Sequence, residues 1–158
     1  MTLLKNLADR RYKMKLFLAG AVSTATESQL EKYNTYKTIL EEFGILTFPD
    51  KIWEYRKKCI RDFPEKSKLE IDKLMVDFDL DLVRNCDVMI CDISQISTGL
   101  GIELGTILEQ NKKIVFFYET GSYVSNMITG AFSDSEFIEY QNIEDLKQSL
   151  LAVMNKLK

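Results

Sequence analysis

The chain has 158 residues, of which 46% are hydrophobic and 28% are charged, a size and composition typical of one globular domain. Its net charge of −3 gives no strong basic field, which argues against a nucleic-acid polymer as partner. The odd number of cysteines, three, predicts reduced thiols in a cytoplasmic protein, and the absence of histidine excludes Ser-His-Asp and Cys-His catalysis and most zinc sites.

The chain opens with a charged stretch followed by an apolar run. Residues 1–13 are too short and too charged for a signal peptide or a membrane span, so we interpret them as an N-terminal extension of a domain over residues 14–158. The run KLFLAG, residues 15–20, predicts a buried strand. After a polar loop, Thr26 and Gln29 have the spacing of a capping box and predict the start of a helix that ends near residue 44.

The middle of the chain alternates in the same way. ILTFP, residues 45–49, predicts a second strand, whereas the charged residues 50–68 predict a long loop with at most one short helix. Apolar positions recur at helical spacing over residues 69–85. DVMICDI, residues 87–93, is apolar in its middle and predicts a central parallel strand covered on both faces.

The last third completes an α/β pattern. We expect a helix from the SQISTG segment to about Gln110, a strand over residues 113–118, an irregular loop over 121–131, a short strand over 136–140 and an amphipathic C-terminal helix. This alternation predicts a single α/β domain with a doubly wound, Rossmann- or flavodoxin-like, mostly parallel five-stranded sheet. Ligands in such folds bind beyond the carboxyl ends of the strands.

Two carboxylates stand out as candidates for chemistry. Asp79 lies in the apolar stripe of the predicted helix over residues 69–85. Its neighbours three and four residues away are all apolar: Met75, Val76, Leu82 and Val83. Burial raises the pKa of a carboxyl and suits it to general acid catalysis, but a structural hydrogen bond at a helix edge remains the alternative.

Glu103 lies in the run STGLGIELG, which we expect to open a helix. In the first turn, the helix dipole and free N–H groups would keep Glu103 ionised, as a nucleophile must be, although an ordinary first-turn glutamate is the alternative. Gly99 and Gly101 permit close approach of a ligand. The run is neither a Walker phosphate loop nor a GxGxxG motif, because no Gly-Lys-Ser/Thr follows and the glycine spacing differs.

These residues resemble a known family. DLDLVRNCDVMICDISQISTGLGIELGTIL, together with LFLAGA before it and SNMITGA after it, resembles the nucleoside 2-deoxyribosyltransferase superfamily, in particular its branch of 2'-deoxynucleoside 5'-monophosphate N-glycosidases. The resemblance covers residues 15–131. It implies that Glu103 and Asp79 are the catalytic residues. It also implies that Ser97 and Ser125 contact a phosphate, with Ser125 coming from a neighbouring subunit of a homodimer or larger homo-oligomer with composite sites.

The substrate-binding positions that we carry over form one set: Phe17, Gly20, Ser23, Ser97, Gly99, Gly101, Ser125 and Asn126. Two features depart from the branch. Its Gly-Ser-x-Arg loop reads Gly20, Ala21, Val22 and Ser23 here, and its first-strand tyrosine is Phe17. The serine and the arginine that lie near the phosphate in that branch are therefore missing.

The resemblance implies an enzyme that cleaves the N-glycosidic bond of (2'-deoxy)nucleoside 5'-monophosphates. The expected course is a retaining double displacement through a glycosyl-enzyme intermediate that releases the free base, for which two carboxylates lie about 5 Å apart. The partner would be a small nucleoside or nucleotide, with no metal, organic cofactor or membrane implied. A nucleoside 2-deoxyribosyltransferase, which exchanges bases between deoxynucleosides, and a non-catalytic nucleotide-binding or signalling module remain alternatives.

Overall fold

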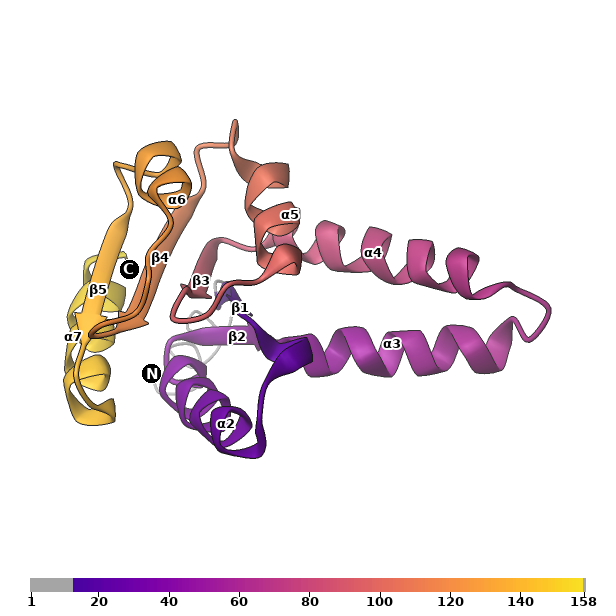
Figure 1. Ribbon diagram of the computed structural model, residues 1–158, viewed down its shortest axis with the longest axis horizontal. Helices are drawn as coiled ribbons and strands as arrows, with labels where there is room; N and C mark the ends of the chain where they lie inside the picture. Colours follow the sequence, from indigo (N-terminus) through magenta and orange to yellow (C-terminus); the bar gives the residue numbers. More distant parts are fainter. Residues whose placement is uncertain (1–12, 158) are drawn as a thin grey trace, which may run out of the picture.

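A computed structural model describes residues 13–157 and contains one five-stranded sheet (Figure 1). The strand order is β2-β1-β3-β4-β5, and every neighbouring pair is parallel, so the sheet is wholly rather than mostly parallel. The strands are β1 (Met14–Ala19), β2 (Gly44–Thr47), β3 (Val88–Asp92), β4 (Lys113–Glu119) and β5 (Glu136–Tyr140). The predicted α/β class and central position of β3 are confirmed, and all five residues of β3 are buried.

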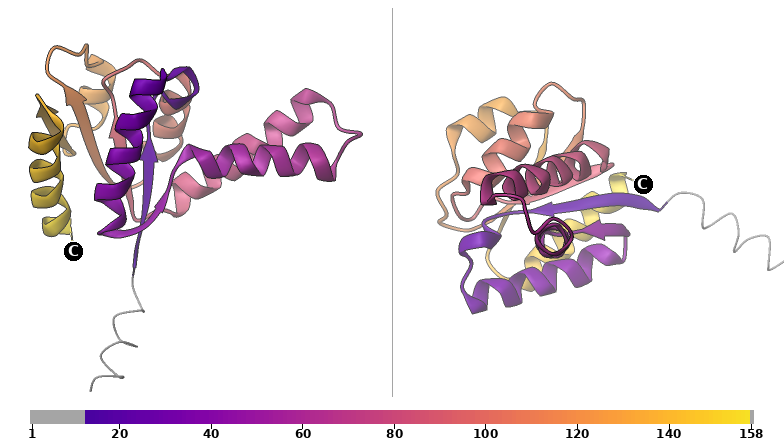
Figure 2. Two further views of the ribbon diagram at one scale, coloured as in Figure 1. Left: turned by 90° about the horizontal axis from the view of Figure 1, so that it is seen from below. Right: turned by 90° about the vertical axis from the view of Figure 1, so that its right-hand side faces the viewer.

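Helices cover both faces of the sheet (Figure 2). One face packs against α2 (Glu27–Glu41) and α7 (Ile143–Leu157), and the other against α4 (Lys68–Asn85), α5 (Thr98–Ile107) and α6 (Asn126–Ala131). The short 3-10 helix η1 (Val22–Thr24) follows β1. The chain turns to one face after β1 and to the other after β3, so the switch point of the doubly wound sheet lies between these two strands.

Side-chain caps fix where the main helices begin. Thr26 and Gln29 form the predicted capping box on α2, and Ser67 and Glu70 form a second one on α4. Ser97 caps α5 by accepting a hydrogen bond from the N–H of Leu100 at 3.2 Å. The helix ends at Ile107, three residues before the predicted end at Gln110.

The predicted loop over residues 50–68 is wrong. Most of it forms α3 (Pro49–Asp62), which packs beside α4, and the two helices project from the sheet as an arm (Figures 1 and 2). Proline suits the first turn of α3, since it needs no N–H partner there. Along the arm, the Tyr55 and Phe78 rings stack with centroids 4.1 Å apart.

The predicted irregular loop over residues 121–131 is also partly wrong, because its second half forms α6, capped by the Ser125 hydroxyl. The predicted N-terminal extension lies, except for Lys13, outside the described residues. Within residues 13–157, no helix has the length and apolar character needed to cross a membrane.

Candidate active site

The packing of α4 against α5 brings Asp79 and Glu103 together. Asp79 lies on α4, and Glu103 is the sixth residue of α5, which begins at Thr98. Both residues are half-buried, but Asp79 Oδ1 and Glu103 Oε2 are buried and have no hydrogen-bond partner among the described residues. Unpartnered buried oxygens are costly in a structural pair, so a functional role accounts for them better than packing does.

Burial sets the protonation of this pair. Burial, and then the charge of Asp79, raises the pKa of Glu103 to about 9, and burial also raises the pKa of Asp79. Two carboxyls that share an apolar site cannot both ionise readily, so the pair retains one proton at neutral pH. The side chains therefore divide into one acid and one carboxylate, as a double displacement requires.

The expectation that the helix dipole keeps Glu103 ionised is wrong. Glu103 lies in the second turn of α5, whose first turn contains no acidic residue, and the dipole acts mainly within the first turn. Burial beside Asp79 outweighs what remains of that effect. The raised pKa of Asp79, in contrast, agrees with its apolar neighbours in the sequence.

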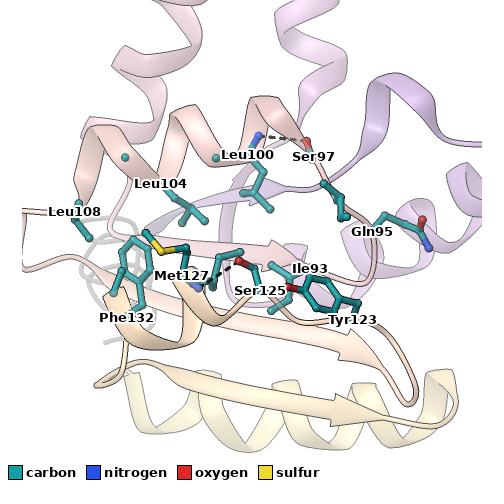
Figure 3. Close-up of a pocket in the computed structure, with 15 residues that line it drawn as sticks. Ile93, Gln95, Ser97, Leu100, Leu104, Leu108, Tyr123, Ser125, Met127 and Phe132 are labelled. Atoms are coloured by element: carbon teal, nitrogen blue, oxygen red, sulfur yellow. Dashed lines mark hydrogen bonds between the residues drawn. The ribbon is translucent and has the colours of Figure 1, made fainter.

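The two candidate phosphate-binding serines meet at a different place. Ser97 and Ser125 line a cavity of about 340 Å³ between α5 and α6, which is otherwise mainly apolar (Figure 3). Each hydroxyl caps its own helix; the Ser125 hydroxyl accepts from the N–H of Met127 at 3.3 Å. The N-terminal ends of two helices therefore open towards this cavity.

This cavity and Glu103 lie on opposite flanks of α5. On α5 the cavity is lined by Leu100, Gly101, Leu104, Gly105 and Leu108, not by Glu103. Gly101 and Gly105 each lie two residues from Glu103, which is about 160° around a helix of 3.6 residues per turn. The structure thus brings together Asp79 with Glu103, and Ser97 with Ser125, but keeps the two pairs apart.

The remaining predicted site residues have varied surroundings. Phe17 is fully buried in the core between the sheet and α4 and α5. A Cβ on Gly20 would lie 2.1 Å from Tyr33 Oη, so packing requires this glycine. Ser23 and Asn126 are exposed, in η1 and at the start of α6. A Cβ on Gly99 would touch only Ser97 Oγ, at 3.8 Å, and one on Gly101 would meet no atom within 4 Å.

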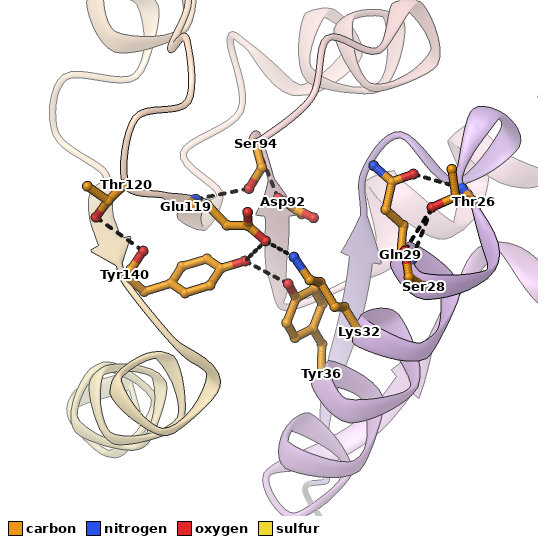
Figure 4. Close-up of polar contacts among 10 residues, drawn as sticks. All are labelled: Thr26, Ser28, Gln29, Lys32, Tyr36, Asp92, Ser94, Glu119, Thr120 and Tyr140. Carbon is orange, nitrogen blue, oxygen red and sulfur yellow. Dashed lines mark hydrogen bonds and ion pairs between the residues drawn. The ribbon is translucent and has the colours of Figure 1, made fainter.

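Sequence reasoning missed a polar cluster at the switch point (Figure 4). Its centre is Asp92 at the end of β3, the one buried charged side chain among the described residues. The Asp92 carboxylate accepts from the Ser94 N–H at 3.0 Å, and burial raises the pKa of Asp92. Lys32 on α2 pairs with Glu119 at the end of β4 and so spans the crevice. The one signal of this cluster in the sequence is Asp92 itself, an acidic residue at the end of an apolar strand.

The cluster extends to two tyrosines. The Tyr36 and Tyr140 hydroxyls lie 2.7 Å apart, and Tyr140 Oη donates to Glu119 Oε1 at 3.3 Å (Figure 4). Only about 50 Å³ of free space remains among these side chains. Within residues 13–157, no three His, Cys, Asp or Glu side chains gather where they could hold a metal ion. The polar cluster therefore closes the crevice on the side of α2, while the carboxyl pair lies on the other face of the sheet.

Comparison with known proteins identifies the family. The model of the family described as nucleoside 2-deoxyribosyltransferase matches residues 16–136. The chain belongs to this family. Within the family match lie both members of the carboxyl pair and both serines of the cavity.

Curated relatives carry names that specify a reaction. The chain is 33% identical over 82 residues to the human 5-hydroxymethyl-dUMP N-hydrolase, and this alignment covers 51% of this chain and 47% of that protein. It is 30% identical over 82 residues to the protein of the same name from Tetraodon nigroviridis, covering 51% and 58%, respectively. A putative 2'-deoxynucleoside 5'-phosphate N-hydrolase 1 from Trichoplax adhaerens is 32% identical over 87 residues, covering 54% and 57%. The matches thus span about half the length of these relatives.

Solved structures show the fold of the nucleoside 2-deoxyribosyltransferase family. A CMP N-glycosidase from Clostridium botulinum aligns over 86% of this chain and 97% of its own, with a TM-score of 0.56 and 19% identity. A 2-deoxyribosyltransferase from Bacillus psychrosaccharolyticus aligns over 89% and 95%, with a TM-score of 0.61 and 20% identity. At these identities the likeness concerns the fold alone.

Proposed function

We propose that the protein cleaves the N-glycosidic bond of (2'-deoxy)nucleoside 5'-monophosphates and releases the free base. The observation that carries this proposal is the Asp79–Glu103 pair, half-buried between α4 and α5 with one unpartnered oxygen on each carboxyl. The family match and the names of the N-hydrolase relatives support the reaction class.

In this reaction the one proton that the pair retains lies on Asp79 once the substrate has bound, so the Glu103 carboxylate attacks C1' of the sugar and forms a glycosyl-enzyme ester. Asp79 donates a proton to the departing base, and water then hydrolyses the ester, so the configuration at C1' is retained. The negative charge beside C1' stabilises the oxocarbenium-like transition state. The chain's own carboxyls supply each of these roles.

The 5'-phosphate preference is supported by the start of α5. Ser97 caps this ten-residue helix, whose N-terminal end favours a negatively charged group. The lysines and arginines of residues 51–68 are the other candidate phosphate ligands, and they lie on α3, on the loop after it and at the start of α4. Two of them, Lys58 and Arg61, already form ion pairs with Asp62. We therefore assign the phosphate to the start of α5 and to partner-subunit groups.

We also propose a homodimer or larger homo-oligomer with composite active sites. Ser125 lines the cavity beside α5, whereas Glu103 lies on the opposite side of that helix. The helix therefore separates Ser125 from the carboxyl pair of its own chain. The cavity is rimmed by exposed apolar side chains, Ile96, Leu108, Tyr123 and Met127. A second copy seated there would cover this apolar rim and place its own Ser125 beside the first copy's Ser97, at the start of α5 where we assign the phosphate. The three free, buried cysteines are consistent with the cytoplasmic location that we propose.

Mixing two inactive variants tests the composite site. We expect Glu103→Gln and Ser125→Ala to be impaired separately in base release from nucleotides. Co-expressed as heterodimers, they form one site that has both native side chains, so activity returns towards a quarter to a half of the wild-type value on the statistics of mixing. An active monomer in light scattering would contradict the composite arrangement.

Two other functions remain as alternatives. A deoxyribosyltransferase uses the same carboxyls but passes the sugar to a second base, so adding a free base would yield a new nucleoside. A non-catalytic module would bind nucleotide without releasing base. Chromatography of nucleosides and their monophosphates after incubation separates the three. Unchanged base release by Glu103→Gln would reject the proposed mechanism.

A further inference from the structure

The loop between β3 and α5, residues 93–97, connects the polar cluster around Asp92 to the start of α5. We propose that Asp92 is a positioning residue that anchors this loop, so that the Ser97 hydroxyl and the first N–H groups of α5 meet the 5'-phosphate of the substrate. This inference rests on the proposed function, because it concerns the phosphate position assigned there. It adds a residue outside both the carboxyl pair and the cavity, to which neither the family match nor the names of the relatives give a role.

The Asp92 carboxylate is satisfied by donors in and beside the loop. The side chain is only 7% exposed, and it accepts a hydrogen bond from the Ser94 N–H at 3.0 Å. The hydroxyls of Ser94 and Tyr33 also donate to it. A carboxylate accepts at both oxygens, so it can serve all three donors, whereas an apolar side chain could serve none. Because burial of an acid is costly without such partners, the contacts with Ser94 indicate what the acid at this position does.

Ser94 joins this carboxylate to the neighbouring strand. The Ser94 hydroxyl accepts a hydrogen bond from the Glu119 N–H at the end of β4, at 3.1 Å. One residue earlier, the Ile93 N–H donates to the Phe117 carbonyl oxygen at 3.0 Å. The loop is therefore tied to the end of β4 and, through Asp92, to the end of β3 (Figure 4).

The loop beyond Ser94 has no further anchor of this kind. Within residues 13–157, Gln95 and Ile96 form no hydrogen bond, and Ile96 is 85% exposed. Ser97 follows directly as the N-cap of α5. The anchor at Ser94 is therefore the last fixed point of the chain before the phosphate position. Because a displacement of about 1 Å in a binding group can cost roughly 100-fold in rate, we expect release of this loop to weaken phosphate binding.

The cluster around Asp92 has no room for a ligand of its own. The free space among its side chains is about 50 Å³, whereas small-molecule sites begin at roughly 300 Å³. Gln95 lines both this space and the cavity of about 340 Å³ that contains Ser97 and Ser125, so one loop separates the cluster from the cavity (Figure 3). The cluster is therefore placed to support the loop from behind rather than to bind substrate itself.

The phosphate preference, defined as the Kd for a nucleoside divided by the Kd for its 5'-monophosphate, tests the anchor. Calorimetry with the common 2'-deoxynucleosides and their monophosphates gives both values for the full chain in a Glu103→Gln background, where neither ligand is cleaved. Asp92→Ala should lower the preference by about tenfold or more, whereas Asp92→Asn, which keeps an oxygen acceptor for the Ser94 N–H, should lower it by less than about threefold. With Glu103 restored, KM for the nucleotide should rise while kcat stays within about threefold.

Two further variants separate the anchor from general stability. Ser94→Ala removes the acceptor of the Glu119 N–H and should also lower the phosphate preference. Combined with Asp92→Ala, it should lower the preference by less than the product of the two single effects, because both changes release one anchor. Tyr140→Phe is the matched control. It removes contacts with Tyr36 and Glu119 inside the cluster but none with the loop, so the phosphate preference should not change.

The outcomes separate this inference from the proposed function. A phosphate preference that is unchanged in Asp92→Ala and Ser94→Ala, or that falls equally in Tyr140→Phe, overturns the anchor and leaves base release by the wild type intact. If Asp92→Ala does not fold, Ser94→Ala alone decides. A phosphate preference that depends on Ser94, together with no base release from any nucleotide by the wild type, supports the anchor and rejects the function.

Discussion

The raised pKa of Glu103 predicts that this side chain costs stability at alkaline pH. Unfolded, Glu103 ionises near pH 4.5, whereas in the folded protein its pKa is about 9. Between these values the folded state holds a proton that the unfolded state lacks, so the free energy of unfolding falls as the pH rises towards 9 and is independent of this group above 9. Replacement of Glu103 by the isosteric glutamine removes this dependence.

The expected magnitude follows from the linkage relation. One bound proton changes the free energy of unfolding by about 1.4 kcal/mol per pH unit, which sets an upper limit of about 2.7 kcal/mol between pH 7 and 9. Glu103 is half-buried and part of a coupled pair, so we expect roughly 1–2 kcal/mol after solvent screening. The advantage of Glu103→Gln over the wild type should grow by this amount over that range and then stay constant.

Urea unfolding followed by circular dichroism at pH 7, 8, 9 and 10 measures this difference. Glu109→Gln is the matched control, because it makes the same chemical change at an exposed glutamate just beyond α5. Its unfolding free energy should follow the wild type at each pH. A gap between wild type and Glu103→Gln that does not change from pH 7 to 9 would refute the assignment of the proton to the folded pair.

Three further changes test single contacts. Gly20→Ala should destabilise by about 1–3 kcal/mol through overpacking against Tyr33, with partial recovery in a Tyr33→Phe background, measured by urea unfolding. Ser97→Ala should raise KM for a nucleotide more than for its nucleoside, and loss of the helix cap should lower the free energy of unfolding by about 1 kcal/mol. Equal changes in KM for the two substrates would mean that Ser97 acts only as a helix cap. Tyr140→Phe should cost about 1–3 kcal/mol in thermal unfolding, since Tyr36 loses its hydroxyl partner.

The sheet could be predicted from the sequence because its three central strands, β1, β3 and β4, each contain a run of at least four consecutive buried apolar residues. All five predicted strands are present, and the buried core of β3 matches the uninterrupted run in the sequence. The helix α3 was missed because the arm is solvated on most sides. Only Ile52 and Cys59 of α3 are buried, seven residues apart, so the charged residues between them conceal the helical period.

The site divides in a similar way. The apolar neighbours of Asp79 along one helix predicted its raised pKa, because that effect depends on local spacing. The protonation of Glu103 could not be predicted, since it depends on a carboxyl from another helix and on where α5 begins. The cluster around Asp92 draws its partners from α2, β4 and β5, which sequence spacing does not bring together.

The GLGIELG run serves two surfaces of one helix. Glu103 lies two residues from Gly101 and from Gly105, so the glutamate faces α4 while both glycines face the cavity beside α6. A Cβ atom added at either glycine would meet no atom within 4 Å, so packing within one chain does not require a glycine at these positions. They leave room on the flank where Ser97 and Ser125 meet, which is the flank that a second copy would cover. Under the proposed function and assembly, the same seven residues would therefore place the nucleophile on one side of the helix and the subunit contact on the other.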